Sequence, residues 1–112
     1  MKISEMKELL GAQVLCCDEN LDREVNSACG CDLMSDVLAF VKDQAVLLTG
    51  LVNPQVIRTA VMMDMVCIVF VRSKTPSEEM LSLARDNGIV IMQCDKRLYE
   101  ACGIIYSSGL GR

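Results

Sequence analysis

Residues 45–94 decide the fold, and they read AVLLTGLVNPQVIRTAVMMDMVCIVFVRSKTPSEEMLSLARDNGIVIMQC. This stretch contains three short apolar runs, each the pattern of a strand buried on both faces of a sheet. The runs lie at 45–49, 66–71 and 89–93. Helical signals fill the two intervals between them. Strands that alternate with helices through such short joints predict a parallel sheet with right-handed crossovers.

Both helices of this stretch carry start signals. Asn53-Pro54 offers a cap followed by proline at the first helical position, which predicts a helix to about Met63. Thr75-Pro76-Ser77-Glu78 matches a capping box and predicts a helix to about Asp86. Asn87-Gly88 then ends that helix, because glycine accepts the left-handed conformation at little cost.

The two ends of the chain are expected to add elements around this core. In chain order, we expect a helix at 5–10 capped by Ser4, a strand at 12–16, a helix beginning near Asp32 or Ser35, and a last short helix from Asp95 to Gly103. Residues 24–31 are ambiguous, since weak strand formers surround a glycine there. This region is the least determined part of the predicted fold.

At 112 residues, the chain fits a single domain spanning 1–112. Hydrophobic residues make up 52% of it and the mean hydropathy is +0.34. No apolar run reaches the roughly 18 residues that a membrane helix needs, so we expect no membrane partner. Part of the apolar surplus is expected at a subunit interface, which predicts a homodimer. The start, MKISE, lacks the apolar core of an export signal, and we therefore expect a cytoplasmic protein.

Charge and residue usage exclude several function classes. A net charge of −4 argues against binding to nucleic acid, and an aromatic content of 4% argues against a base-stacking platform. The absence of histidine removes the commonest general acid/base. Asp32, Asp36 and Asp64 are candidate catalytic carboxylates, but the sequence has no other motif that would complete a catalytic site with them. We therefore predict no catalytic residues and a protein that is not an enzyme.

Seven cysteines without an export signal indicate reduced thiols. Cys29-Gly30-Cys31 is the spacing that suggests a metal or redox role. A tetrahedral thiolate site needs about four ligands, usually in two closely spaced pairs, and the other cysteines supply no second pair. We therefore expect no metal and no cofactor, and keep a small redox or metal protein that uses Cys29 and Cys31 as an alternative.

Polar residues gather where two of the predicted strands end. Ligands of parallel sheets bind beyond the carboxyl ends of the strands, where helix N-termini present free N–H groups. The candidate ligand-binding residues are Thr49, Gly50, Asn53, Arg58, Arg72, Lys74 and Thr75. Together they predict a site for a nucleotide or another small anion, although neither a P-loop nor a GxGxxG motif is present. The alternative is that Asn53 and Thr75 only cap helices and that the cations are solvated.

Five segments carry a family resemblance. They are CDLMSDVLAF at 31–40, LLTGL at 47–51, IRTA at 57–60, FVRSKTP at 70–76 and YEACG at 99–103. In these segments the chain resembles DRTGG-domain proteins, in the small stand-alone form found in anaerobic bacteria. The literal Asp-Arg-Thr-Gly-Gly string is absent, and Leu48-Thr49-Gly50 and Arg58-Thr59 are its nearest fragments.

This family is similar to the N-terminal domain of HPr kinase/phosphorylase. The resemblance implies an α/β fold, a three-layer α/β/α sandwich on a mixed, mostly parallel sheet. It also implies a non-enzymatic regulatory or sensor module that forms a homodimer and binds a nucleotide or small anionic metabolite, since the family serves as a regulatory module in larger enzymes. The alternative implied by the stand-alone form is a protein–protein adaptor that docks on an iron hydrogenase or a metabolic enzyme.

Overall fold

The computed structural model describes residues 1–41 and 44–110 of the chain. Within these residues, helices and strands alternate along most of the sequence. They are α1 (Ile3–Leu10), β1 (Gln13–Cys16), the 3-10 turn η1 (Asp18–Asn20), β2 (Ser27–Gly30), α2 (Met34–Phe40), β3 (Ala45–Thr49), α3 (Pro54–Met62), β4 (Cys67–Phe70), α4 (Glu78–Asp86), β5 (Val90–Gln93) and α5 (Leu98–Ser107).

The five strands form one sheet in the order β1-β5-β4-β3-β2. Strands β2 to β5 are parallel to one another, and β1 runs antiparallel to β5. The predicted mixed, mostly parallel sheet is therefore confirmed. Thr49 pairs with Phe70, and Phe70 pairs with Gln93, so the carboxyl ends of β3, β4 and β5 lie level with one another.

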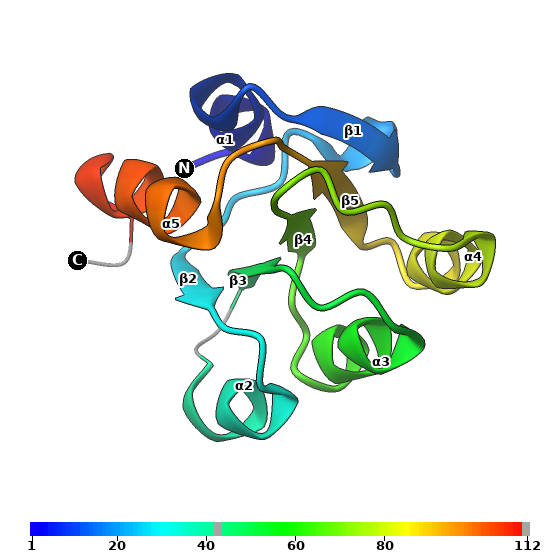
Figure 1. Ribbon diagram of the computed structural model, residues 1–112. Helices are drawn as coiled ribbons and strands as arrows, with labels where there is room; N and C mark the ends of the chain where they lie inside the picture. The colour runs from blue at the N-terminus through cyan, green and yellow to red at the C-terminus, as the bar shows by residue number, and fades with distance from the viewer. Residues whose placement is uncertain (42–43, 111–112) are drawn as a thin grey trace.

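Helices cover both faces of the sheet and give the predicted three-layer α/β/α arrangement (Figure 1). Helices α1 and α5 contact each other on one face, while α2, α3 and α4 pack in a row on the other. Strand β1 lies at one edge of the sheet and β2 at the opposite edge. The β2 edge therefore lies between α5 on one side and α2 on the other.

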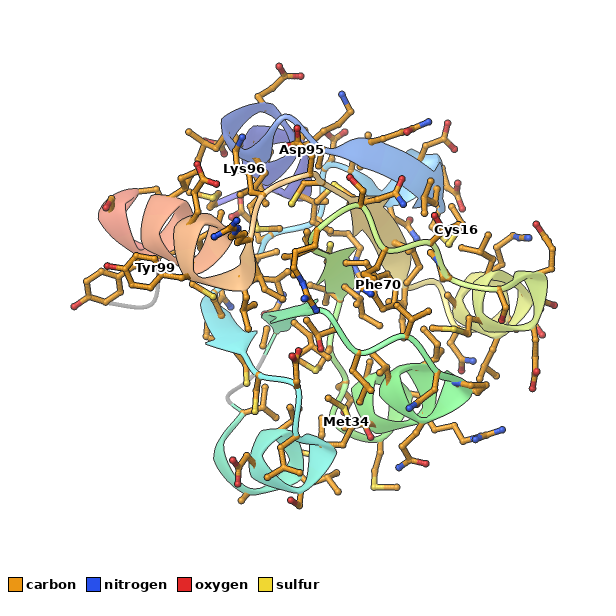
Figure 2. All side chains as sticks on the ribbon, viewed as in Figure 1. Cys16, Met34, Phe70, Asp95, Lys96 and Tyr99 are labelled. Atoms are coloured by element: carbon orange, nitrogen blue, oxygen red, sulfur yellow. The ribbon has the colours of Figure 1, made fainter. Side chains whose placement is uncertain are left out.

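The central strands are buried because both of their faces are covered by helices. Every residue of β3 and β4 is buried, and Phe70 of β4 lies near the middle of the sheet (Figure 2). Their apolar sequences, broken only by Thr49 at the end of β3, follow from this position, since neither face meets water. Among the described residues, no helix is both long and apolar enough to cross a membrane.

Two predicted helix starts in the core and at the N-terminus are wrong. Helix α4 begins at Glu78, because Ser77 Oγ accepts a hydrogen bond from Met80 N at 3.3 Å. Thr75 is therefore not the cap of this helix. Helix α1 begins at Ile3 rather than after Ser4, because the Lys2 N–H is satisfied by Glu5 Oε1 at 3.0 Å.

The segments flanking the core also differ from the predictions. Residues 24–31 contribute β2, so the ambiguous region is an edge strand. Helix α2 begins at Met34 with Leu33 in the cap position, and neither Asp32 nor Ser35 caps it. Helix α5 begins at Leu98 and continues past Gly103, so Asp95 is not its cap and Gly103 does not end it.

Candidate functional site

Thr49 and Gly50, at the carboxyl end of β3, direct two hydrogen-bond donors at one oxygen atom. The Thr49 hydroxyl donates to Asp32 Oδ1 at 2.8 Å, and the Gly50 N–H donates to the same atom at 2.8 Å. Thr49 Oγ1 in turn accepts from Leu51 N at 3.1 Å, which fixes the orientation of the hydroxyl. Thr49 itself is fully buried although it is polar, so its hydroxyl is held by the fold. These groups form a small oxyanion-binding arrangement.

Arg72, just beyond β4, closes the same site from the neighbouring strand. A Cβ built on Gly50 would lie only 2.6 Å from Arg72 Nη2, so the guanidinium rests directly on this glycine. Arg72 and Ser73 both have left-handed backbone conformations, with φ of 56° and 55°. Such conformations cost free energy in residues other than glycine. Here the surrounding loop holds them, because Arg72 N donates to Lys96 O and Ser73 N donates to Cys94 O, both at 2.8 Å.

Gln93, the last residue of β5, fastens the loop that carries Lys74 and Thr75. Its side-chain amide nitrogen lies 3.1 Å from Ser73 O, 2.7 Å from Lys74 O and 3.0 Å from Thr75 Oγ1. Gln93 thereby holds the segment immediately after Arg72. The Lys74 side chain is exposed and adds a second cation at this edge of the sheet.

Asn53 and Arg58 are less closely tied to this arrangement. Asn53 occupies the cap position of α3, but its side chain accepts no capping hydrogen bond. Its Oδ1 atom is buried and has no hydrogen-bond partner among the described residues. Arg58 is an exposed residue of α3, and nothing in the described structure joins its side chain to Gly50 or Arg72. The predicted residues that come together are therefore Thr49, Gly50 and Arg72.

Sequence reasoning missed Asp32 and Gln93. Both follow the same rule that identified Thr49 and Arg72, because each lies at the carboxyl end of a strand of the parallel sheet. Asp32 follows β2, which the sequence left ambiguous. The prediction therefore named it as a helix cap and as a candidate catalytic carboxylate, and did not include it in the ligand site.

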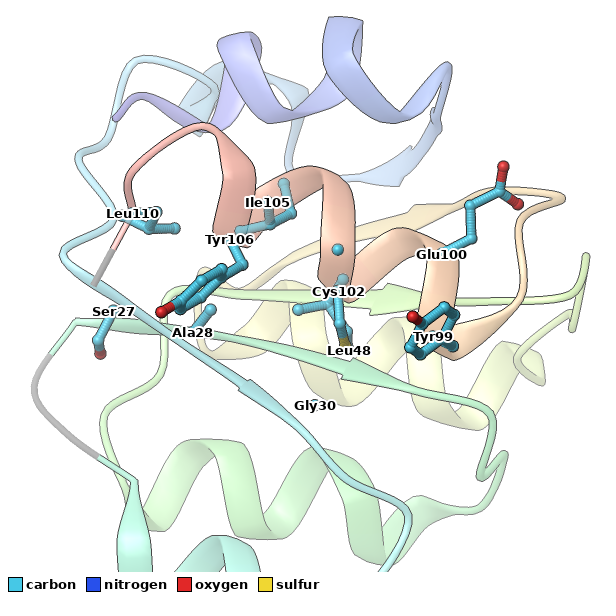
Figure 3. A pocket seen from close by; sticks show the side chains of 11 residues that line it. Ser27, Ala28, Gly30, Leu48, Tyr99, Glu100, Cys102, Ile105, Tyr106 and Leu110 are labelled. Carbon is cyan, nitrogen blue, oxygen red and sulfur yellow. The ribbon is translucent and has the colours of Figure 1, made fainter. Parts of the chain in front are cut away.

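A separate groove of about 600 Å³ lies between α5 and the β2 edge (Figure 3). Tyr99 and Tyr106 project from α5 along it, and both rings are largely exposed, at 93% and 64%. Cys102 Sγ fills the space that a Cβ on Gly30 would need, so this glycine allows α5 to approach β2 closely. The groove is mostly apolar, and it is distinct in composition from the strand-end site.

Two thiols near this edge, Cys29 and Cys102, have a raised pKa. Burial raises the pKa of Cys29, and the neighbouring Cys31 and Cys102 raise it further. Burial also raises the pKa of Cys102. Reactive and metal-binding cysteines instead have a lowered pKa. Across residues 1–41 and 44–110, no group of three or more His, Cys, Asp or Glu residues is arranged to hold a metal ion.

The sequence model of the DRTGG domain matches residues 5–108, which is nearly the whole chain. This protein belongs to the DRTGG domain family. The resemblance to DRTGG-domain proteins is thereby confirmed, and DRTGG domains are regulatory domains. A comparison with curated protein sequences finds no significant match.

A solved structure supports the fold. It is the regulatory region of Clostridium perfringens pyrophosphatase, with its CBS and DRTGG domains, in complex with the activator diadenosine tetraphosphate. The TM-score is 0.77 at 16% sequence identity, and the match covers 96% of this chain. It covers 46% of the other chain, so this DRTGG protein spans less than half the length of that regulatory region.

Proposed function

We propose that this DRTGG protein is a non-enzymatic regulatory domain that senses a nucleotide or another small anionic metabolite at the carboxyl ends of β3 and β4. The observation that carries the proposal is the convergence of the Thr49 hydroxyl and the Gly50 N–H on one oxygen at 2.8 Å, beneath the Arg72 guanidinium. A hydroxyl, a backbone N–H and a guanidinium are donors that phosphate and carboxylate oxygens accept well.

Further observations support a regulatory role. The family is one of regulatory domains, and the C. perfringens relative was crystallised with a nucleotide activator. In addition, the chain has no histidine, and Asp32 is engaged by Thr49 and Gly50 rather than directed at a nucleophile or a metal. Among the described residues of this site, no side chain is placed to act as a general acid or base.

The ligand is tested by calorimetry with adenine and guanine nucleotides, including diadenosine tetraphosphate, on the wild type and Arg72→Ala. We expect one or more nucleotides to bind, and Arg72→Ala to weaken the binding by about tenfold or more, as loss of a charge-assisted contact does. Arg85→Ala is the matched control, because Arg85 is exposed on α4 and forms a surface salt bridge with Glu78 at 3.5 Å. Absence of binding by every nucleotide would refute the nucleotide proposal.

We also propose that a second copy of this chain covers the β2 edge. Cys31 N donates to Leu48 O of β3. Along a parallel strand, successive residues direct their backbone N–H and C=O groups to opposite sides. Ala28 and Gly30 therefore direct their N–H and C=O groups away from β3. Tyr99 and Tyr106 of α5 line a groove beside this edge, and Leu38 of α2 and its cap residue Leu33 are exposed apolar side chains as well. An isologous contact between two such edges would bury them together.

The dimer is tested by light scattering at micromolar concentration. Ala28→Pro removes one outward N–H while proline remains tolerable at an edge position, and we expect it to shift the mass toward the monomer. Met62→Ser is the control, because Met62 is 70% exposed but lies on α3. A monomeric wild type would contradict the dimer and favour the alternative of an adaptor, in which the same apolar groove receives a partner enzyme.

A further inference from the structure

Asp32 belongs to the segment between β2 and α2, yet its carboxylate reaches across to β3. Both of its hydrogen bonds are made by Oδ1, to Thr49 Oγ1 and Gly50 N. Within the described structure, Asp32 forms no salt bridge, and its side chain is exposed. The carboxylate is therefore held at its site by two hydrogen bonds and not by burial.

The groups that hold Asp32 are the same groups that a ligand oxyanion would need. A carboxylate oxygen and a phosphate oxygen accept the same kinds of hydrogen bond, so the two compete for Thr49 Oγ1 and Gly50 N. Arg72 Nη2 lies against Gly50 and would favour the more highly charged competitor. A ligand anion cannot use these donors while the Asp32 carboxylate stays in place, because two like charges would share one site.

We propose that Asp32 is an internal competitor for the anion site, and that a phosphate-bearing ligand binds by displacing its carboxylate from Thr49 and Gly50. This inference rests on the proposed function of the same site and adds its regulation. Displacement changes the position of a segment that lies two residues beyond the end of β2 and two residues before the start of α2. Ligand binding thereby reaches the β2 edge and the first turn of α2.

The test uses inorganic phosphate and tripolyphosphate, titrated by calorimetry into the wild type, Asp32→Ala and Asp32→Asn. We expect Asp32→Ala to bind both anions about tenfold more tightly, because the donors are vacant and a like charge is gone. Asp32→Asn keeps the acceptor and loses the charge, so its affinity should lie between the other two. Asp36→Ala is the control, since Asp36 is an exposed acid of α2. This substitution removes the same charge from the chain without freeing the Thr49 and Gly50 donors.

The possible outcomes separate this inference from the function on which it rests. Tighter binding of phosphate by Asp32→Ala than by Asp36→Ala, without binding of any nucleotide, upholds the competitor and refutes the nucleotide ligand. If Asp32→Ala binds phosphate no more tightly than Asp36→Ala does, the competitor role is overturned. If Asp32→Ala binds only nucleotide more weakly than the wild type does, Asp32 contributes to ligand recognition instead. In the wild type, amide NMR provides a second measurement. Saturating tripolyphosphate should shift the Gly50 and Met34 amide signals together, and an unmoved Gly50 signal would refute displacement.

Discussion

The Arg72 guanidinium lies on the backbone of Gly50, with Nη2 only 2.6 Å from the position that a Cβ would occupy. This contact joins the end of β4 to the end of β3 at the point where Gly50 N binds Asp32. Only a residue without a side chain leaves room for the guanidinium there. Glycine at position 50 therefore allows the Arg72 guanidinium to approach the backbone closely. It is not needed for a special backbone conformation, since Gly50 is not among the residues with positive φ.

Gly50→Ala tests that relationship. The new Cβ would meet the far end of a flexible side chain, so Arg72 can move aside at little cost in stability. We expect the free energy of unfolding to change by less than about 0.5 kcal/mol. Because the guanidinium is displaced from the site, tripolyphosphate affinity should fall by about threefold to tenfold. Urea unfolding and calorimetry measure the two effects, and an unchanged affinity would show that Arg72 does not serve this site.

Gly103→Ala is a comparison within the same chain and a prediction of its own. Gly103 lies inside α5, and a Cβ there would meet no atom within 4 Å. Alanine in a helix interior is more favourable than glycine by roughly 0.5–1 kcal/mol, so this variant should be stabilised by that amount. Tripolyphosphate affinity should remain that of the wild type. Gly103 lines the groove beside the β2 edge, so destabilisation measured by urea unfolding would instead indicate that the proposed second copy packs against this face of α5.

Gln93→Met tests the clamp on the loop after Arg72. The substitution keeps the length of the side chain but removes the amide that bonds Ser73 O, Lys74 O and Thr75 Oγ1. We expect a loss of about 1 kcal/mol in local stability and, as a result, about fivefold faster tryptic cleavage after Arg72 and Lys74. Gln55→Met is the control, because Gln55 makes a single long contact of 3.5 Å with Thr59 Oγ1. Equal cleavage of both variants would contradict a holding role for Gln93.

The sequence predicted the centre of this fold well for a physical reason. Strands β3 and β4 meet helices on both faces, so all their positions except Thr49 are apolar and the pattern is unmistakable. Strand β2 lies at an edge, where Ala28 and Gly30 are exposed and small. Its pairing with β3 is set by the sheet as a whole, and local propensity could not reveal it.

The site was predictable only in part for a related reason. Thr49, Gly50 and Arg72 were found because each lies at or just beyond the end of a strong strand. The Asp32 contact joins residues 17 positions apart across two strand ends, and no local pattern encodes that distance. At the start of α4 the local sequence offers two helix caps instead of none, because Ser77 and Thr75 are both good caps by residue type. The packing of Thr75 Oγ1 against Gln93 leaves Ser77 to cap the helix.

We expect the folded protein to lose stability at alkaline pH, because Cys17 is a buried thiol. It is buried and 7% exposed, and burial, followed by the neighbouring Cys16, raises the pKa of its thiol to about 11 from an ordinary value near 9. The unfolded chain therefore releases this proton at lower pH than the folded chain does. The stabilisation is complete below about pH 9 and is lost as the pH rises through about 11, and it amounts to about 3 kcal/mol.

Urea unfolding of reduced protein between pH 8 and pH 11 measures this loss. We expect the wild type to lose stability steadily over that interval. Cys17→Ala should lose less, because the group responsible for part of the difference in proton binding is gone. Some loss should remain in the variant, since burial also raises the pKa of Cys16 and Cys67. Identical pH dependence in the two proteins would show that the Cys17 thiol titrates alike in the folded and unfolded chains.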